Sequence, residues 1–355
     1  MGLSFRWVQL SLDHLGAQRT GRDVRRALKT LPDTLNTSYA GILSRIPAAD
    51  RLLAREALLW LSFSSRPLKL TELCEAIALR DGESTIDDEC RLHQEDAILE
   101  ICRGLIESHH GIVSLAHSSV KIFLCSDWIF QSSVDYFTIQ VSEVHRTLMH
   151  KCLQYLSLDE FRTGYCTDSD ALNTRSQAYP LLIYAAQSWP VHAKSLAFNS
   201  WDRETIMRFL STRHLHHGGN YASWVQVLLP EQDVHTILRT QPLYYAASFG
   251  LLSVVKLILE VDRVIDVDAR GGRYNSTPLF VTCFRSHFDV ARILLHAGAD
   301  PDLLDGGGAG YSVKWLLGRR AQRMPDAASL LHDIQNGVFV KNGHSRGGAL
   351  KGSCS

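Results

Sequence analysis

Apolar residues recur every three or four positions along most of this chain, the spacing that places them on one face of an α-helix. Leu53, Ala57, Trp60 and Leu61 follow it in one clear stretch. In the first part of the chain the pattern predicts helices over 23–29, 33–46, 50–63, 72–79, 95–107 and 119–128, several of them bounded by a proline or a potential capping residue. One short extended segment over 112–116 interrupts the helices. The sequence therefore predicts a mainly all-α fold.

Two stretches in the second part of the chain share one pattern in register. They are QPLYYAASFGLLSVVKLILE at 241–260 and STPLFVTCFRSHFDVARILLHAGADPD at 276–302. Each begins near a Pro-Leu pair and predicts a short apolar helix followed by an amphipathic one. In the second stretch Thr277 can cap the first helix, Pro278 suits its first turn, and Gly298 suits a left-handed position after the second helix.

These stretches resemble ankyrin repeats, which are two-helix units of about 33 residues that bind proteins. The prolines at positions 242 and 278 are spaced slightly wider than that period, so the connecting finger over 261–275 carries a small insertion. A third, degenerate copy is expected over 311–331. Because two repeats cannot bury a core alone, we expect caps over 181–238 and 311–334. The alternative is a helical hairpin that only resembles ankyrin.

Composition narrows the functional classes. Lysine and arginine total 37 and aspartate and glutamate total 37, so no net charge attracts nucleic acid or an anionic membrane. No apolar run reaches the roughly 18 residues of a membrane-spanning helix, and the N-terminal segment lacks the pattern of a secretory signal. Eight scattered cysteines without a Cys-x-x-Cys pair suit a reducing compartment, so we expect a cytoplasmic protein.

A second resemblance covers most of the chain. Helices followed by a brief hairpin are typical of a winged helix, and several spaced motifs strengthen this interpretation. They are Phe5-Arg6-Trp7; Leu31-Pro32 with Thr34, Leu35, Tyr39, Ile42 and Leu43; Trp60-Leu61 with Phe63, Arg66-Pro67-Leu68, Leu70, Glu72 and Leu73; Leu115-Ala116-His117 with Ser119, Val120 and Lys121; and Tyr179-Pro180-Leu181-Leu182 with Tyr184, Ala185, Ala186 and Trp189. Together they resemble fungal NACHT–ankyrin proteins, of the STAND group of NOD-like signalling ATPases.

The resemblance implies a domain order. It predicts the helical tail of an ATPase-type module over 1–32, a winged-helix domain over 33–130, a helical neck over 140–238, ankyrin repeats over 239–335 and a disordered tail over 336–355. In the family this domain is called the GPI inositol-deacylase winged helix. The name describes the domain and implies no deacylase activity. The Gly-x-x-x-x-Gly-Lys-Ser/Thr phosphate loop of such ATPases is missing from this sequence, so we assign it no ATP chemistry.

Other candidate chemistry is weak. The glycine run at 306–310 lacks the strand and helix of a dinucleotide loop, and the histidines at 109–110 and 214–217 lack the partners of a zinc site. His117 and Ser119 lie in no Gly-x-Ser-x-Gly elbow, so we interpret them as a buried histidine bonded to backbone, or as an N-cap at Ser119. The 95–107 helix is too acidic for DNA. We expect no enzyme activity, cofactor, metal ion or nucleic acid.

The predicted function is therefore binding of a protein partner, with contacts on the fingers and first helices of the repeats. Aromatic and arginine side chains are favoured as interface anchors. The candidates are Tyr244, Tyr245, Phe249, Arg273, Tyr274, Phe284 and Arg285. Packing between repeats is the alternative role for each aromatic residue. Two other hypotheses stay open: a fragment of a larger signalling ATPase that acts in cis, and a decayed relative. Self-association is also open.

Overall fold

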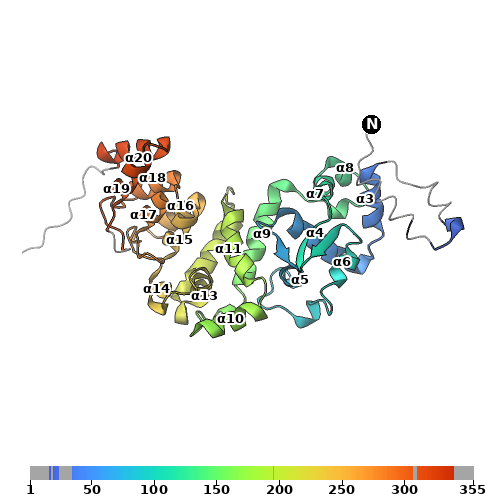
Figure 1. The fold of residues 1–355 in the computed structure, drawn as a ribbon. Coiled ribbons are helices and arrows are strands. Elements are labelled where there is room, and N and C mark those ends of the chain that lie inside the picture. Colours follow the sequence, from blue (N-terminus) through green and yellow to red (C-terminus); the bar gives the residue numbers. More distant parts are fainter. Residues whose placement is uncertain (1–15, 17–18, 24–33, 195, 307–309, 340–355) are drawn as a thin grey trace, which may run out of the picture. The chain divides into compact units, whose positions relative to one another are not determined.

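The chain divides into two units, Met1–Leu196 and Ala197–Ser355, in the computed structural model (Figure 1). The structure describes residues 16, 19–23, 34–194, 196–306 and 310–339. The predicted helix over 23–29, the module tail over 1–32 and the tail over 336–355 lie largely outside these residues. The all-α prediction is confirmed, since both units are mainly helical. Among the described helices, none combines the length and apolar character needed to span a membrane.

The first unit begins with helices and a small sheet. Its elements are α3 (Leu35–Ser44), α4 (Arg51–Phe63), β1 (Leu68–Lys69), α5 (Leu70–Ala78), α6 (Ala97–Ile101), β2 (Ile106–His109), β3 (Ile112–Leu115), α7 (Ser118–Leu124), α8 (Asp127–Phe130), α9 (Val141–Leu156), α10 (Ser169–Ala178) and α11 (Leu182–Ala193). The sheet is antiparallel with the order β1-β3-β2. Helices that pack against a short antiparallel sheet form the predicted winged helix, and α9 and α11 pack together after it.

Two predicted helices are wrong in extent. The one over 95–107 is reduced to α6, because Arg103 and Gly104 both have positive φ and turn the chain into β2. The one over 119–128 is divided into α7 and α8. Its N-cap is His117, whose Nδ1 accepts a 3.1 Å hydrogen bond from the Ser119 amide. The predicted hydrogen bond between His117 and the backbone is therefore confirmed, but the side chain is exposed and not buried, and Ser119 is not the N-cap.

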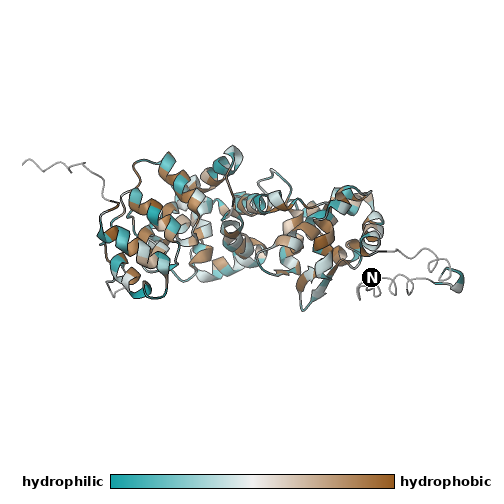
Figure 2. Ribbon diagram, turned by 90° about the horizontal axis from the view of Figure 1, so that it is seen from above, coloured by the Kyte–Doolittle hydropathy of each residue, from teal (hydrophilic) through white to brown (hydrophobic). Residues whose placement is uncertain are grey.

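The second unit is a stack of helix pairs. Its elements are α12 (Ser200–Ser211), α13 (Gly219–Leu228), α14 (Val234–Arg239), α15 (Pro242–Phe249), α16 (Leu252–Val261), α17 (Pro278–Phe284), α18 (Phe288–His296), α19 (Val313–Arg320) and α20 (Pro325–Gln335). The first helices α15, α17 and α19 are successive neighbours, and so are the second helices α16, α18 and α20. In Figure 2 single helices carry hydrophobic and hydrophilic residues side by side, so each can bury one face against the next pair.

Local chemistry sets the ends of the central helix pair as predicted. The Thr277 hydroxyl accepts a 3.1 Å hydrogen bond from the Phe280 amide, and Pro278 opens α17. Gly298 lies just after α18 with a φ of 97°. Val290 and Leu294 are buried on the inner face of α18. Each residue suits the backbone at its helix end. The threonine hydroxyl bonds an amide that has no partner in the helix, proline lacks an amide that would go unpaired in the first turn, and glycine adopts the left-handed conformation without strain.

The first repeat is capped by helices of the same unit. The Trp224 ring of α13 lies 5.1 Å from the Tyr245 ring of α15, measured between centroids. The cap predicted over 181–238 is wrong in its start, because α11 belongs to the first unit whereas α12, α13 and α14 belong to the second. The division between the units also falls inside the stretch 140–238 that was expected to form one neck.

Candidate protein-binding groove

The segment between α16 and α17, residues 262–277, forms a finger that ends in a tight turn. Gly271 and Ser276 exchange backbone hydrogen bonds of 3.0 and 3.1 Å across it. Gly272 has a φ of 65°, a conformation that glycine adopts without a steric penalty. Arg273 and Tyr274 follow it within the turn, and both are exposed. The hairpin therefore projects two of the residues that the sequence predicts as partner contacts.

A second finger, described over residues 297–306 and 310–312, lies between α18 and α19 and is fastened to the first. The Arg270 guanidinium donates to the carbonyl oxygens of Asn275 at 3.1 Å and Leu304 at 2.6 Å, so one side chain joins both fingers. The Asp268 carboxylate accepts a 3.1 Å hydrogen bond from the Asp300 amide. These charge-assisted contacts fix the spacing of the two fingers.

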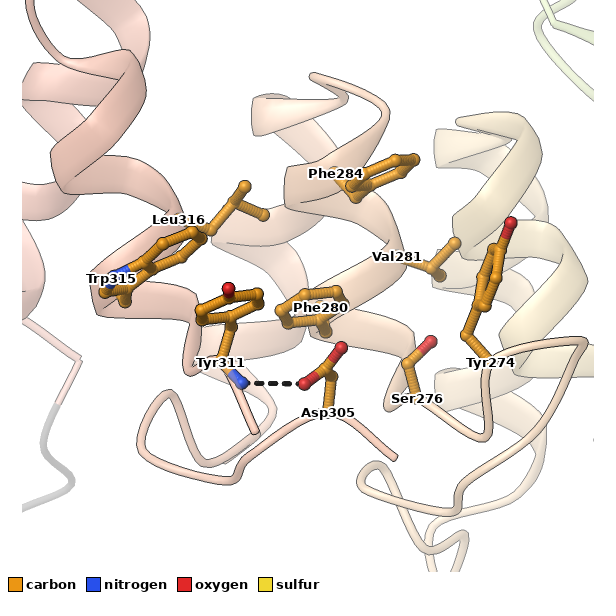
Figure 3. A pocket seen from close by; sticks show the side chains of 9 residues that line it. All are labelled: Tyr274, Ser276, Phe280, Val281, Phe284, Asp305, Tyr311, Trp315 and Leu316. Atoms are coloured by element: carbon orange, nitrogen blue, oxygen red, sulfur yellow. Dashed lines mark hydrogen bonds between the residues drawn. The ribbon is translucent and has the colours of Figure 1, made fainter. Parts of the chain in front are cut away.

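A pocket of about 290 Å³ opens between these fingers and the first helices α17 and α19 (Figure 3). We call it the aromatic pocket. Its lining comprises Tyr274 and Ser276 of the first finger, Phe280, Val281 and Phe284 of α17, Asp305 and Tyr311 of the second finger, and Trp315 and Leu316 of α19. The pocket therefore depends on the stacking of two helix pairs.

The pocket has a buried base and exposed aromatic walls. Phe280, Val281 and Leu316 are buried. The rings of Tyr311 and Trp315 are stacked, with centroids 3.7 Å apart and an angle of 12° between their planes. Four wall residues keep much of their surface in solvent, with exposures of 58% for Tyr274, 52% for Phe284, 42% for Trp315 and 39% for Tyr311. Exposed apolar residues gathered round a concavity are typical of interaction sites.

Cationic side chains already cover some of these rings. The Arg319 guanidinium lies 5.4 Å from the centroid of the Trp315 ring, and that of Arg320 lies 5.6 Å from the Phe284 ring. Arg320 also donates to the Cys283 carbonyl and the Ser286 hydroxyl, both at 2.9 Å. The guanidinium of Arg320 is thus held in place, because its donors bind groups at the end of α17.

The structure brings some of the predicted contact residues together. Tyr274 and Phe284 line the aromatic pocket, while Arg273 and Arg285 are exposed next to them in sequence. Phe249 is half-buried in α15.

The other two predicted contacts need correction. Tyr244 and Tyr245 are each only 5% exposed, so a partner would not contact them directly. Tyr244 packs under the Gly272 turn and places its hydroxyl 3.2 Å from the Ser276 hydroxyl. The Tyr245 ring packs on Trp224 and Phe249. Both tyrosines therefore act in packing, the alternative role recognised for each aromatic residue.

Sequence reasoning missed Tyr311, Trp315 and the two arginines of α19. The stretch from Tyr311 onward was interpreted only as a degenerate repeat or cap. A signal was present, because Tyr311, Trp315 and Arg319 recur at a spacing of four and form one exposed stripe. Such a stripe on the last helix pair could have indicated a binding face in addition to a cap.

Outside the aromatic pocket we looked for side chains that could bind a metal ion or act in catalysis. In the described part of the chain, no three histidine, cysteine, aspartate or glutamate side chains are grouped so that they could hold a metal ion. Burial raises the pKa of Cys102 and of Cys283 to about 12. In the first unit the Nδ1 atoms of His145 and His192 are 3.0 Å apart, and burial lowers the pKa of both.

Comparisons with known proteins agree with this organisation. Residues 214–305 match ankyrin repeats in three copies, and residues 44–140 match the winged helix domain of the GPI inositol-deacylase type. The chain is also similar to the azaphilone pigments biosynthesis cluster protein L of Monascus ruber, with 27% identity over 299 residues. That match covers 77% of this chain and 61% of the relative. No solved structure gives a significant match.

The comparisons refine the sequence interpretation. The chain carries ankyrin repeats and a winged helix of the expected type. The matched repeats begin within the predicted neck and end before α19, whereas the sequence pattern indicated repeats over 239–335. The pair α19 and α20 therefore lies beyond the matched repeats, although it continues their stack.

Proposed function

We propose that this chain is a non-catalytic protein-interaction module that binds a partner through the aromatic pocket and the finger beside it. The observation that carries the proposal is the pocket itself, in which four exposed aromatic residues surround a buried apolar base within an ankyrin-type stack. Ankyrin repeats generally mediate protein binding, and aromatic and arginine side chains dominate the energy of many interfaces.

The distribution of reactive groups supports a binding role over a catalytic one. A catalytic thiol needs thiolate character near neutral pH, whereas burial raises the pKa of the thiols of Cys102 and Cys283. A general base must reach a substrate in a cleft, whereas His192 is buried in the first unit against His145. The pocket lining offers one carboxylate, Asp305, and it accepts a 2.7 Å hydrogen bond from the Tyr311 amide.

A paired variant tests the proposal. Arg273→Glu with Tyr274→Ala removes two exposed side chains of the finger turn and leaves the glycine conformations unchanged. Quantitative capture of proteins from an extract of the producing organism should fall for this variant, while its circular dichroism and unfolding midpoint stay close to wild type. Lys256→Glu with Leu252→Ala on α16 is the matched control and should capture normally. Unchanged capture by the finger variant would remove the finger from the binding site.

A finer proposal is that the module regulates a signalling system related to fungal NOD-like receptors. The order of a winged helix followed by ankyrin repeats supports it, as do the motifs that resemble NACHT–ankyrin proteins. The printed name of the Monascus relative associates that protein with a pigment biosynthesis cluster and names no reaction. A denaturing blot of the endogenous protein distinguishes a free-standing adaptor from one part of a larger signalling protein. A band near 39.8 kDa supports a free-standing adaptor, and a much larger band supports action in cis with further domains.

A further inference from the structure

Four arginines lie over rings of the aromatic pocket or next in sequence to its wall residues, beside one lining carboxylate, Asp305. Arg273 precedes Tyr274, Arg285 follows Phe284, and Arg319 and Arg320 lie over the Trp315 and Phe284 rings. Among the residues that the structure describes, none of these four arginines forms a salt bridge, whereas Arg203, Arg208 and Arg292 of the same unit each pair with a carboxylate. Arg319 and Arg320 therefore bring positive charge to the pocket wall that no carboxylate of the described residues pairs with. Together with Arg273 and Arg285, which are exposed next to Tyr274 and Phe284 in sequence, we call them the arginine rim.

Arg273 and Arg285 also act electrostatically on two buried tyrosines of α15. Burial raises the pKa of Tyr245, and the charge of Arg273 counters part of that rise. Burial likewise raises the pKa of Tyr244, and Arg285 counters part of it. Arg273 and Arg285 are themselves exposed, and each is next in sequence to a residue of the pocket wall, Tyr274 or Phe284.

Acidic groups near the pocket are already engaged. The Asp305 carboxylate accepts a hydrogen bond from the Tyr311 amide, and Asp302 forms a salt bridge with Lys314 at 2.8 Å. Asp268 accepts the Asp300 amide between the fingers. These carboxylates belong to the fingers, and of the three only Asp305 lines the pocket. Asp305 keeps its negative charge, so four arginines stand against one lining carboxylate, and this balance favours an anionic ligand over a cationic one.

The aromatic faces point to the same conclusion. A lysine, arginine or methylated lysine would need a free ring face for a cation–π contact. Arg319 and Arg320 already lie over Trp315 and Phe284, so a cationic guest would meet like charge at close range. An uncharged apolar side chain meets no such penalty and buries the exposed parts of the walls.

The volume of the pocket limits the size of the guest. At about 290 Å³ it lies just below the roughly 300–1,000 Å³ of typical small-molecule sites. This volume suits one large side chain with its flanking backbone. Its base of Phe280, Val281 and Leu316 is apolar, which suits an aromatic or long aliphatic residue.

We propose that the partner presents a short acidic peptide segment whose large apolar side chain enters the aromatic pocket while its flanking carboxylates pair with the arginine rim. This inference rests on the proposed function and specifies the chemistry of the partner. The apolar anchor supplies affinity through burial, and the carboxylates supply orientation and the rate of encounter.

Selection from a displayed library of random short peptides, with the full chain as bait, tests the inference. We expect enrichment of peptides that combine one tryptophan, phenylalanine or leucine with several aspartate or glutamate residues. A selected peptide is then synthesised with a fluorescent label and titrated. Its binding should weaken at higher ionic strength, because contacts between exposed charges are screened.

Matched variants locate the bound peptide. Arg273→Glu with Arg285→Glu should weaken its binding roughly tenfold or more, and Phe284→Ala should do the same. Lys256→Glu with Arg263→Glu makes the same change in net charge on exposed residues outside the pocket lining and should leave binding within about twofold of wild type.

The outcomes distinguish this inference from the proposed function. If basic or uncharged peptides are selected and Phe284→Ala abolishes their binding, the inference of an acidic partner is wrong, but the aromatic pocket is still a binding site. Equal binding of acidic peptides to the arginine variant would also overturn the inference, since they would then bind elsewhere. If no peptide is enriched, a short segment is insufficient and the inference fails, while protein capture still tests the proposed function independently.

Discussion

Two adjacent tyrosines in α15 occupy different environments. The Tyr244 hydroxyl lies 3.2 Å from the Ser276 hydroxyl, whereas the Tyr245 hydroxyl is buried without a hydrogen-bond partner among the described residues. A buried hydroxyl without a partner costs free energy, since it gives up its bonds to water. Tyr245→Phe removes that cost and keeps the ring contact with Trp224.

We therefore expect Tyr245→Phe to raise the free energy of unfolding by about 1 kcal/mol. The matched change Tyr244→Phe deletes a hydrogen bond and should lower it by about 1 kcal/mol. Urea denaturation of both variants and the wild type measures the difference. Destabilisation by Tyr245→Phe would indicate that its hydroxyl has a partner.

We expect His192, which is buried beside the exposed His145, to make the first unit sensitive to acid. Burial and, to a smaller extent, the charge of the neighbouring His145 lower the pKa of His192 to about 4. Burial and the charge of Lys121 also lower the pKa of His145. The Tyr184 hydroxyl faces the other ring nitrogen of His192 at 3.4 Å. Since the two Nδ1 atoms are 3.0 Å apart, one ring must accept the hydrogen bond and stay neutral.

Below its unfolded pKa of about 6.5, His192 takes up a proton only in the unfolded state, until the pH falls to about 4. The free energy of unfolding should therefore decrease by up to about 3 kcal/mol between pH 7 and pH 4. His192→Asn should flatten this part of the pH profile. A profile with an unchanged slope in the variant would show that other groups control the acid response.

At the scale of elements, the first finger depends on one glycine. Gly272 has a φ of 65°, and a Cβ atom there would lie 2.4 Å from the Tyr244 ring. Gly272→Ala should therefore lower the free energy of unfolding by at least about 2 kcal/mol. Gly318→Ala in α19 is the control, because no atom lies within 4 Å of its Cβ position. It should be neutral or raise stability by about 0.5–1 kcal/mol. Equal effects of the two changes in thermal unfolding would contradict this description of the finger.

The elements also show which features a sequence can predict. Thr277, Pro278 and Gly298 act through their own backbone neighbours, so their roles follow from local chemistry. The early end of α6 was missed because Arg103, which is not glycine, adopts a positive φ that local preference disfavours. The next residue, Gly104, gave a weak signal of this end.

Only part of the aromatic pocket could be predicted, because stacking of two helix pairs brings its residues together. Tyr274 and Phe284 belong to the repeat whose pattern was clear. Tyr311 and Trp315 belong to the next helix pair, which joins them only through stacking of α17 on α19. The burial of Tyr244 and Tyr245 likewise depends on the finger and on α13, segments distant from them in sequence.

At the scale of the whole molecule, every residue that lines the aromatic pocket belongs to the second unit. A fragment of residues 197–355 should therefore fold and capture the same partner as the full chain, with a dissociation constant within about threefold. Circular dichroism checks the fold, and titration with the purified partner checks the affinity. A folded fragment that captures nothing would assign a direct role in binding to the first unit.

The most direct test of the binding role is site-specific photo-crosslinking in an extract of the producing organism. A photoreactive phenylalanine analogue replaces Phe284 in the aromatic pocket or Lys256 on the exposed face of α16. We predict a discrete adduct with one protein for the probe at 284, reduced by Arg273→Glu with Tyr274→Ala, and none for the probe at 256. Adducts of equal yield at both positions, or no adduct at 284 while the chain still captures a protein, would contradict binding through this groove.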